Sequence, residues 1–79
     1  MNDFEKTEQK RIAKLVSLGF EEVDGREFEL VANDVLIRVQ LFDDGVVGLT
    51  TWDYINEKET RAGYRTFAPV MRKIKQLMA

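Results

Sequence analysis

The spacing of apolar residues changes twice along this chain, from a helical period to alternation and back to a helical period. In residues 4–18 the apolar positions recur with helical spacing, which predicts an amphipathic helix. Gly19 is expected to end this helix, because glycine adopts the left-handed cap conformation at least cost. In residues 27–54 apolar and polar positions alternate, which predicts strands with one buried face. After Thr66, the predicted N-cap, residues 67–78 return to helical spacing and predict a second helix.

Two turn sequences divide the alternating segment into three strands. Asn33-Asp34 has the chemistry of a two-residue hairpin turn, and it separates strands at residues 27–32 and 35–42. The agreement between this turn and the apolar pattern sets the pairing register of the two strands. The predicted pairs are Phe28 with Val39 and Leu30 with Ile37 on the apolar face, and Glu29 with Arg38 on the opposite face.

The second turn, Asp43-Asp44-Gly45, decides which side chains of the third strand enter the core. As a three-residue loop with a left-handed glycine, it points Val47 and Leu49 inward and leaves Trp52 on the other face. A two-residue loop would instead turn Trp52 into the core, beside a glycine and a threonine. We favour the three-residue loop because it buries two aliphatic side chains.

These elements predict a two-layer α+β domain with the order αβββα. Its three-stranded antiparallel sheet would carry the N- and C-terminal helices mainly on one face. A chain of 79 residues is expected to form a single domain, residues 1–79. Two segments stay open. Residues 21–26 form a loop or a ragged start of the first strand, and residues 55–65 form a surface loop or a hairpin that adds a fourth strand.

The composition removes most kinds of catalytic site. The chain has no histidine and no cysteine, so it lacks the commonest general base, the commonest transition-metal ligand and any thiolate. The only serine, Ser17, falls in the first predicted helix with no histidine to activate it. Asp43-Asp44-Gly45 lacks the ligand spacing of a calcium loop, so we interpret it as a turn. We therefore predict a protein that is not an enzyme and that uses no metal or cofactor.

Charge is distributed unevenly, although the net charge at pH 7 is only −2. Residues 1–20 carry +1, residues 21–60 carry −8 and residues 61–79 carry +5. The predicted strands and turns are therefore acidic, and the last segment is basic. Such asymmetry bears on partners rather than on fold.

The second face of the predicted sheet is the candidate binding surface. If both helices cover the face that holds Phe28, the opposite face presents aromatic side chains within a polar rim. The alternative is that a helix or residues 55–65 cover this face and bury Trp52. The predicted partner-binding residues are Glu27, Glu29, Arg38, Phe42, Asp43, Asp44, Trp52 and Asp53. Their acidity favours a protein partner with a basic surface over nucleic acid.

The sequence also indicates where in the cell the protein is expected. No apolar run reaches the roughly 20 residues that a membrane helix needs, and the polar residues 1–9 differ from a secretory signal. We therefore expect a cytoplasmic protein with no membrane partner, present as a monomer or a weak homodimer.

The order helix, three strands, helix resembles that of double-stranded-RNA-binding domains and of the small HicA-type toxins. Leu18-Gly19-Phe20, which closes the first predicted helix ahead of a strand, is similar to the Leu-Gly-Phe that opens many HicA-like chains. The resemblance implies an alternative function, a small RNA- or DNA-binding domain without the catalytic histidine of the toxins. Phe67-Ala68-Pro69-Val70 stands where the RNA-binding domains carry a lysine cluster. The residues that would contact phosphates are Arg65, Arg72, Lys73 and Lys75.

In type rather than in motif, the chain resembles the small inhibitors that phages and other mobile elements encode, including anti-CRISPR proteins. The shared features are short length, acidity, mixed αβ order and the lack of cysteine and catalytic groups. Several of those inhibitors present carboxylates to a nucleic-acid-binding groove and exclude DNA. The resemblance implies a non-enzymatic acidic module that docks on a basic nucleic-acid-binding surface of a larger complex. The acids that would do so are Glu27, Glu29, Asp43, Asp44, Asp53, Glu57 and Glu59.

Overall fold

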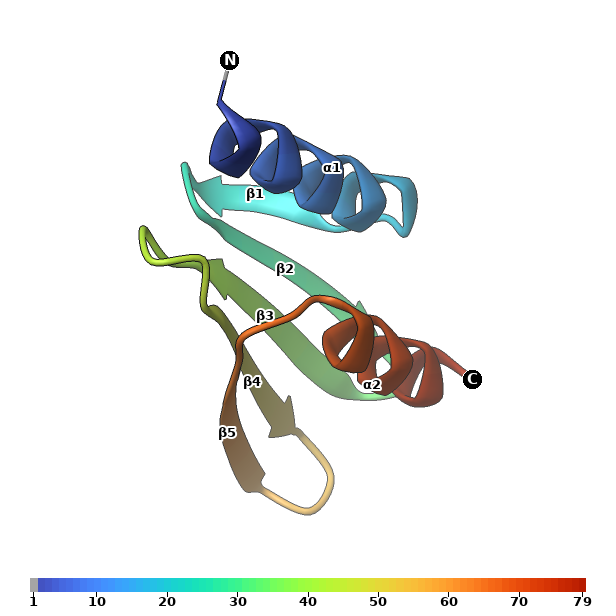
Figure 1. Ribbon diagram of the computed structural model, residues 1–79. Helices are drawn as coiled ribbons and strands as arrows, with labels where there is room; N and C mark the ends of the chain where they lie inside the picture. The colour runs from blue at the N-terminus through green and yellow to red at the C-terminus, as the bar shows by residue number, and fades with distance from the viewer. Residues whose placement is uncertain (1) are drawn as a thin grey trace.

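An antiparallel meander of five strands forms one layer of the molecule, and two helices form the other (Figure 1). The computed structural model describes residues 2–79. The strands follow one another in the order β1-β2-β3-β4-β5, so each pairs with its neighbour in sequence. The elements are α1 (Asp3–Ser17), β1 (Glu21–Asp24), β2 (Glu27–Ala32), β3 (Val35–Leu41), β4 (Val47–Asp53), β5 (Lys58–Tyr64) and α2 (Ala68–Met78).

The prediction of a three-stranded αβββα sheet is wrong, because one further strand lies at each edge. β1 is a short exposed strand that pairs with β2 through an irregular register. β5 pairs with the whole length of β4, from Val47 opposite Tyr64 to Asp53 opposite Lys58. Residues 55–65 therefore hold the last three residues of a turn and the whole of β5, and residues 21–26 hold a strand of their own. The central three strands are those that the sequence predicts.

Both predicted turns are confirmed. Asn33 and Asp34 have φ angles of 52° and 64°, the left-handed pair of a type I′ hairpin turn. Gly45 has φ of 84°, and Phe42 and Val46 close the three-residue loop through a backbone hydrogen bond of 3.0 Å. The predicted strand pairs follow from these turns. They are Phe28 with Val39, Leu30 with Ile37, and Glu29 with Arg38. Across the second turn the structure pairs Leu41 with Val47, Val39 with Leu49, and Leu36 with Trp52, so Val47 and Leu49 face inward and Trp52 lies on the other face, as the three-residue loop predicts.

Both helices pack on the same face of the sheet, as predicted (Figure 1). Leu15 of α1 and Val70 and Ile74 of α2 are fully buried there. After α1, Gly19 is left-handed with φ of 101°, and Phe20 folds back so that its N–H donates to the carbonyl of Leu15. The buried core consists of Leu15, Phe20, Phe28, Ile37, Val39, Leu41, Val47, Leu49, Val70 and Ile74.

The start of α2 differs from the prediction. Its N-cap is Phe67 rather than Thr66, and the cap side chain makes no hydrogen bond. Pro69 lies in the first turn of α2. Backbone N–H groups in the first turn have no acceptor within the helix, so the N–H that proline lacks costs no helical hydrogen bond. Burial of Val70 and Ile74 therefore fixes this helix more than its cap does.

Neither helix of residues 2–79 is long and apolar enough to cross a membrane.

Candidate binding surfaces

The face of the sheet opposite the helices, here called the outer face, is left open by both helices of the described chain. The strand registers place its side chains in rows that cross the sheet. The rows are Val31, Leu36, Trp52 and Glu59; then Glu21, Glu29, Arg38, Thr50 and Arg61; then Asp24, Glu27, Gln40, Gly48 and Gly63. The predicted face therefore exists, and it is wider than predicted because β1 and β5 extend it.

A shallow hollow of about 420 Å³ lies on the outer face where two glycines meet. Gly48 of β4 and Gly63 of β5 are direct partners, so neither strand raises a side chain there. Phe42 closes one end of the hollow. Its ring lies so near Gly48 that a methyl group on this glycine would come within 3.0 Å of the ring. The hollow thus presents bare strand backbone beside an exposed aromatic ring.

A smaller hollow of about 160 Å³ continues along the same face beside Trp52 and Leu36. Both side chains are half-buried, so Trp52 belongs to the outer face and not to the core. Val31, beside Leu36 in the register, is 58% exposed. These three side chains form an apolar row at one end of the face, and Phe42 marks the other end.

Ion pairs and hydrogen bonds cross the outer face between neighbouring strands. Arg38 donates from Nε to a carboxylate oxygen of Glu29 at 2.6 Å, and Gln40 donates to Glu27 at 2.7 Å. The hydrogen bond that Arg38 donates to Glu29, together with the negative charge of Glu29, raises the pKa of Arg38 above its ordinary value. On this face five carboxylates accompany two guanidinium groups, so the face is acidic in sum. The carboxylates belong to Glu21, Asp24, Glu27, Glu29 and Glu59, and the guanidinium groups to Arg38 and Arg61.

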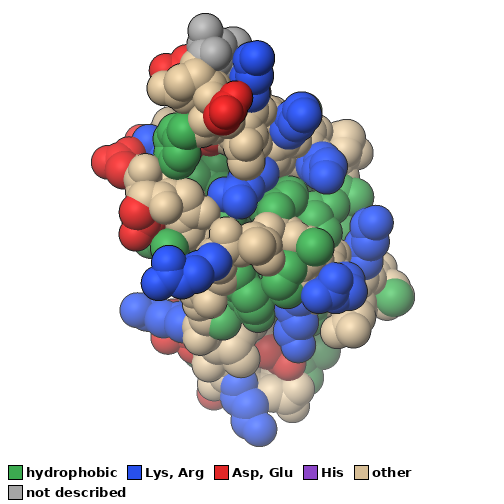
Figure 2. Space-filling view, viewed as in Figure 1, with side chains coloured by type: hydrophobic (Ala, Val, Ile, Leu, Met, Phe, Trp, Pro, Cys, Tyr) green, Lys and Arg blue, Asp and Glu red, His purple; other side chains and the backbone are tan. Residues whose placement is uncertain are grey.

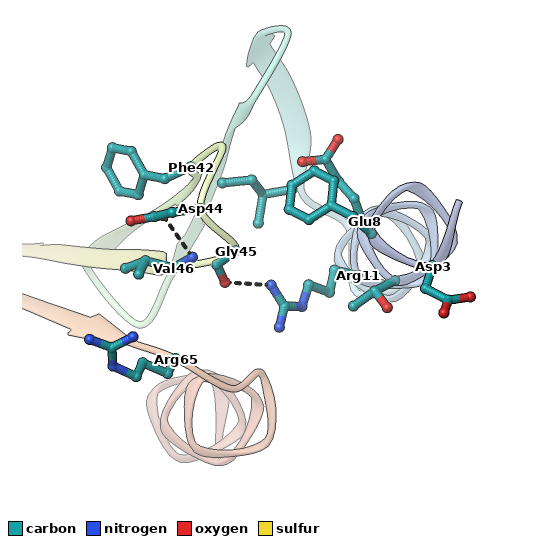
Figure 3. A pocket seen from close by; sticks show the side chains of 11 residues that line it. Asp3, Glu8, Arg11, Phe42, Asp44, Gly45, Val46 and Arg65 are labelled. Atoms are coloured by element: carbon teal, nitrogen blue, oxygen red, sulfur yellow. Dashed lines mark hydrogen bonds between the residues drawn. The ribbon is translucent and has the colours of Figure 1, made fainter. Parts of the chain in front are cut away.

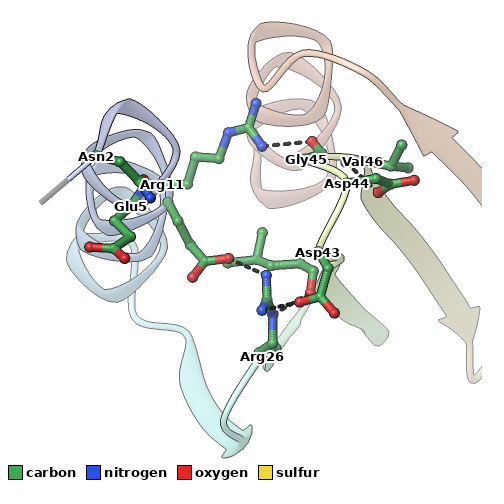
Figure 4. Close-up of polar contacts among 10 residues, drawn as sticks. Asn2, Glu5, Arg11, Arg26, Asp43, Asp44, Gly45 and Val46 are labelled. Carbon is green, nitrogen blue, oxygen red and sulfur yellow. Dashed lines mark hydrogen bonds and ion pairs between the residues drawn. The ribbon is translucent and has the colours of Figure 1, made fainter.

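The three aspartates among the predicted site residues lie in turns. Asp43 accepts from Arg26 at 2.5 Å, and Asp44 accepts the backbone N–H of Val46 at 3.0 Å (Figure 4). Asp53 accepts from the side chain of Asn56 and from the backbone N–H groups of Ile55 and Asn56, and these bonds lower the pKa of Asp53. Each carboxylate therefore already has a structural role in its turn.

The structure accordingly divides the predicted site. Glu27, Glu29, Arg38 and Trp52 share the outer face, and Phe42 borders it. Asp43, Asp44 and Asp53 lie at its ends and support turns. Arg61 and Gly63 of this face were not predicted, and Glu59 was predicted only as one of the docking acids, because all three belong to an edge strand that the sequence left undecided.

A third hollow, of about 300 Å³, lies between the start of α1 and the loop between β3 and β4 (Figure 3). Arg11 reaches across it and donates to the carbonyl of Gly45 at 2.9 Å. Arg65 and Asp44 line the same hollow, together with the exposed ring of Phe4. Because the guanidinium of Arg11 already donates to Gly45, we interpret this hollow as part of the contact between α1 and the β3–β4 loop and not as a binding site.

Among the charged side chains seen on the helix side of the molecule, Lys and Arg predominate, and they lie around the apolar side chains in the middle of the view (Figure 2). The four predicted phosphate-binding residues do not act as one cluster there. Arg72 and Lys75 line a groove between the helices, Arg65 lines the hollow beside the β3–β4 loop, and Lys73 lines neither. Among residues 2–79 no group of histidine, cysteine or acidic side chains is arranged to hold a metal ion.

No protein-family model, curated protein or solved structure matches this chain.

Proposed function

We propose that this chain is a non-enzymatic protein-binding module that uses the outer face of its sheet. The observation that carries the proposal is the pair of neighbouring open hollows along β3, β4 and β5, one bordered by Phe42 and the other by Trp52. Aromatic side chains beside a hollow free of side chains give a partner apolar contact area, and Arg38, Glu59 and Arg61 around the hollow supply hydrogen-bonding groups. The surface is formed by strands of the packed sheet, so it is held in one conformation before a partner arrives.

The charge of this face favours a basic partner. Glu27 and Glu29 already hydrogen-bond to Gln40 and Arg38, which fixes their carboxylates in position. Each carboxylate keeps further acceptor capacity, which lysine or arginine of a partner would fill. The excess of acids would also steer a basic protein toward this face and speed its association.

The partner that fits this chemistry best is a protein whose own basic groove binds nucleic acid. A small acidic domain bound in such a groove would exclude the nucleic acid by occupying its place. The chain would then act as an inhibitor of the anti-CRISPR kind, a role supported by its size, its acidic outer face and the aromatic residues beside it.

Site-specific cross-linking tests the proposal. The photoreactive p-benzoylphenylalanine is placed at Phe42 in one variant and at Lys73 in another, and each is irradiated with native lysate. A protein that cross-links through position 42 but not through position 73 supports the outer face as the binding surface. Equal cross-linking from both positions contradicts it.

The alternative nucleic-acid function is tested by a gel-shift series over salt concentration. A domain that binds through several phosphate contacts loses affinity steeply as salt rises. Salt-dependent binding of RNA or DNA that is lost when Arg65, Arg72 and Lys75 are replaced by glutamine would favour that alternative. We expect no such binding.

A further inference from the structure

A groove of about 500 Å³ runs between α1 and α2, on the side of the molecule opposite the outer face. Leu18, Phe67 and Met71 form its apolar part, and all three pack against the buried core. The groove is therefore bounded by side chains that the fold already holds in place. Arg11 also stacks over Phe67, with 5.7 Å between its guanidinium carbon and the ring centre, which restrains that ring further.

The charged residues that line this groove are all cationic. They are Lys14 of α1 and Arg72 and Lys75 of α2. None of the ion pairs within residues 2–79 involves these three side chains. Lys10 lies four residues before Lys14 and therefore shares its side of α1. The groove thus lies between two basic ridges, one on each helix.

We propose that this groove binds an acidic amphipathic peptide segment of a partner protein, with apolar side chains inserted between the helices. Charge complementarity selects the acidic segment, because its carboxylates would meet Lys14, Arg72 and Lys75, which have no acidic partner within the described chain. The apolar floor selects a peptide with leucine or phenylalanine anchors, since an amphipathic helix in a groove is held by such anchors at helical spacing.

Nucleic acid fits the same groove less well. It would neutralise the cations, but it has no aliphatic side chains to cover Leu18 and Met71. The outer face of a second copy of this chain also fits the groove poorly. A basic helix face joined to an acidic sheet face would link copies head to tail, in a contact that does not close on itself. The acidic peptide satisfies both the charge and the apolar surface.

Fluorescence anisotropy with a defined probe tests this assignment. The probe is a fluorescein-labelled acidic peptide with leucine and phenylalanine at helical spacing, and its scrambled form keeps the composition but loses the apolar stripe. The intact chain is expected to bind the probe at least about tenfold more tightly than the scrambled peptide, because each factor of ten needs only about 1.4 kcal/mol of binding free energy.

Three variants locate the site. The double change Arg72→Glu with Lys75→Glu should weaken probe binding at least about tenfold, since it sets like charges against the peptide. Lys73→Glu is the control, because it reverses one charge on the same helix outside the groove, and it should change affinity less than about twofold. Met71→Ala should weaken binding without any change of charge. Circular dichroism and thermal unfolding confirm that each variant is folded.

Several results would overturn the proposal. They are no binding of the probe, equal affinity for the scrambled peptide, or an effect of Lys73→Glu as large as that of the double variant. Displacement of the peptide by short single- or double-stranded RNA at lower concentration would assign the groove to nucleic acid instead. Because this groove and the outer face lie on opposite sides, each proposal can fail without the other.

Discussion

Phe42 lies across Gly48 on the outer face, and this contact gives the larger hollow its shape. A side chain at position 48 would occupy space that the ring now uses. Phe42 is 46% exposed, so its ring can turn away from an added methyl group without disturbing the core.

Gly48→Ala is therefore expected to move the ring at little cost in stability. The free energy of unfolding should change by less than about 1 kcal/mol, since alanine is also better than glycine within a strand. Nuclear Overhauser contacts between the Phe42 ring and residue 48 would report the displacement. Gly25→Ala is the control, because a methyl group there meets nothing within 4 Å. Unchanged ring contacts in Gly48→Ala, or a loss above about 2 kcal/mol, would contradict the described packing.

Asp53 supports the turn between β4 and β5 through bonds from Asn56 and Ile55, and these bonds lower its pKa below the ordinary value of 3.8. A carboxyl group with a lowered folded pKa stabilises the protein above its unfolded pKa. That contribution falls as the pH drops below 3.8 and is gone below the folded pKa.

The amide resonances of Ile55 and Asn56 should follow this titration, with a midpoint below 3.8. Asp53→Asn removes the titrating group and should abolish the transition. A midpoint at or above 3.8 would show that the carboxylate does not accept these hydrogen bonds in solution.

Single residues explain why the turns were predictable and one helix start was not. Asn33-Asp34 and Gly45 occupy left-handed positions that few other residues accept, so their identity predicts the conformation. Thr66 has the chemistry of an N-cap, yet α2 begins one residue later. There the burial of Val70 and Ile74 decides where the helix lies, and local capping chemistry does not.

Among the elements, the two edge strands mark the limit of prediction from sequence. A strand reveals itself by alternation only when one of its faces is buried. Every residue of β1 is exposed, and of β5 only Tyr64 is half-buried, so neither carries an apolar alternation. β5 is held by backbone hydrogen bonds to β4 and by a hydrogen bond between the side chains of Thr51 and Thr60. Neither interaction produces a pattern of apolar residues in the sequence.

Arg26 joins three elements near one end of the sheet (Figure 4). It donates to Glu8 of α1, to Asp43 in the β3–β4 loop and to the carbonyl of Leu41. Arg26, in the turn between β1 and β2, therefore ties α1 and the β3–β4 loop to this end of the sheet.

Arg26→Lys should lower the free energy of unfolding by about 1 kcal/mol, because one ammonium group cannot reach all three acceptors. Arg61→Lys is the matched control. Its ion pair with Glu59 is highly exposed, so the change should cost less than about 0.5 kcal/mol. Urea unfolding measures both variants. Equal losses would show that the Arg26 contacts are no stronger than an ordinary surface pair.

At the scale of the whole molecule, the uneven charge of the sequence becomes an uneven surface. The acidic middle segment supplies the outer face, and basic residues of both helices border the interhelical groove. The sequence predicted which side chains share the central face, because the two turns set their register. It did not predict the extent of that face or its hollow, because both depend on Gly63 and its neighbours in β5.

The central claim is that a partner binds the outer face, and it depends on acids that can be changed without unfolding the sheet. The outer variant combines Glu27→Gln, Glu29→Gln and Glu59→Gln, since glutamine keeps hydrogen-bonding capacity and loses charge. The distal variant combines Asp3→Asn, Glu5→Gln and Glu22→Gln, which removes the same number of charges from α1 and from a β1 position outside the three outer-face rows. The two variants therefore share a net charge and differ in where it changes.

The most direct measurement follows fluorotryptophan at Trp52 by fluorine NMR while the partner captured through position 42 is added. Trp52 is the only tryptophan of the chain, so its resonance reports the outer face alone. We predict that the resonance shifts on binding and that the outer variant binds at least about tenfold more weakly than the wild type and the distal variant. A resonance that stays unchanged at saturation, together with equal affinity of both variants, would contradict the claim.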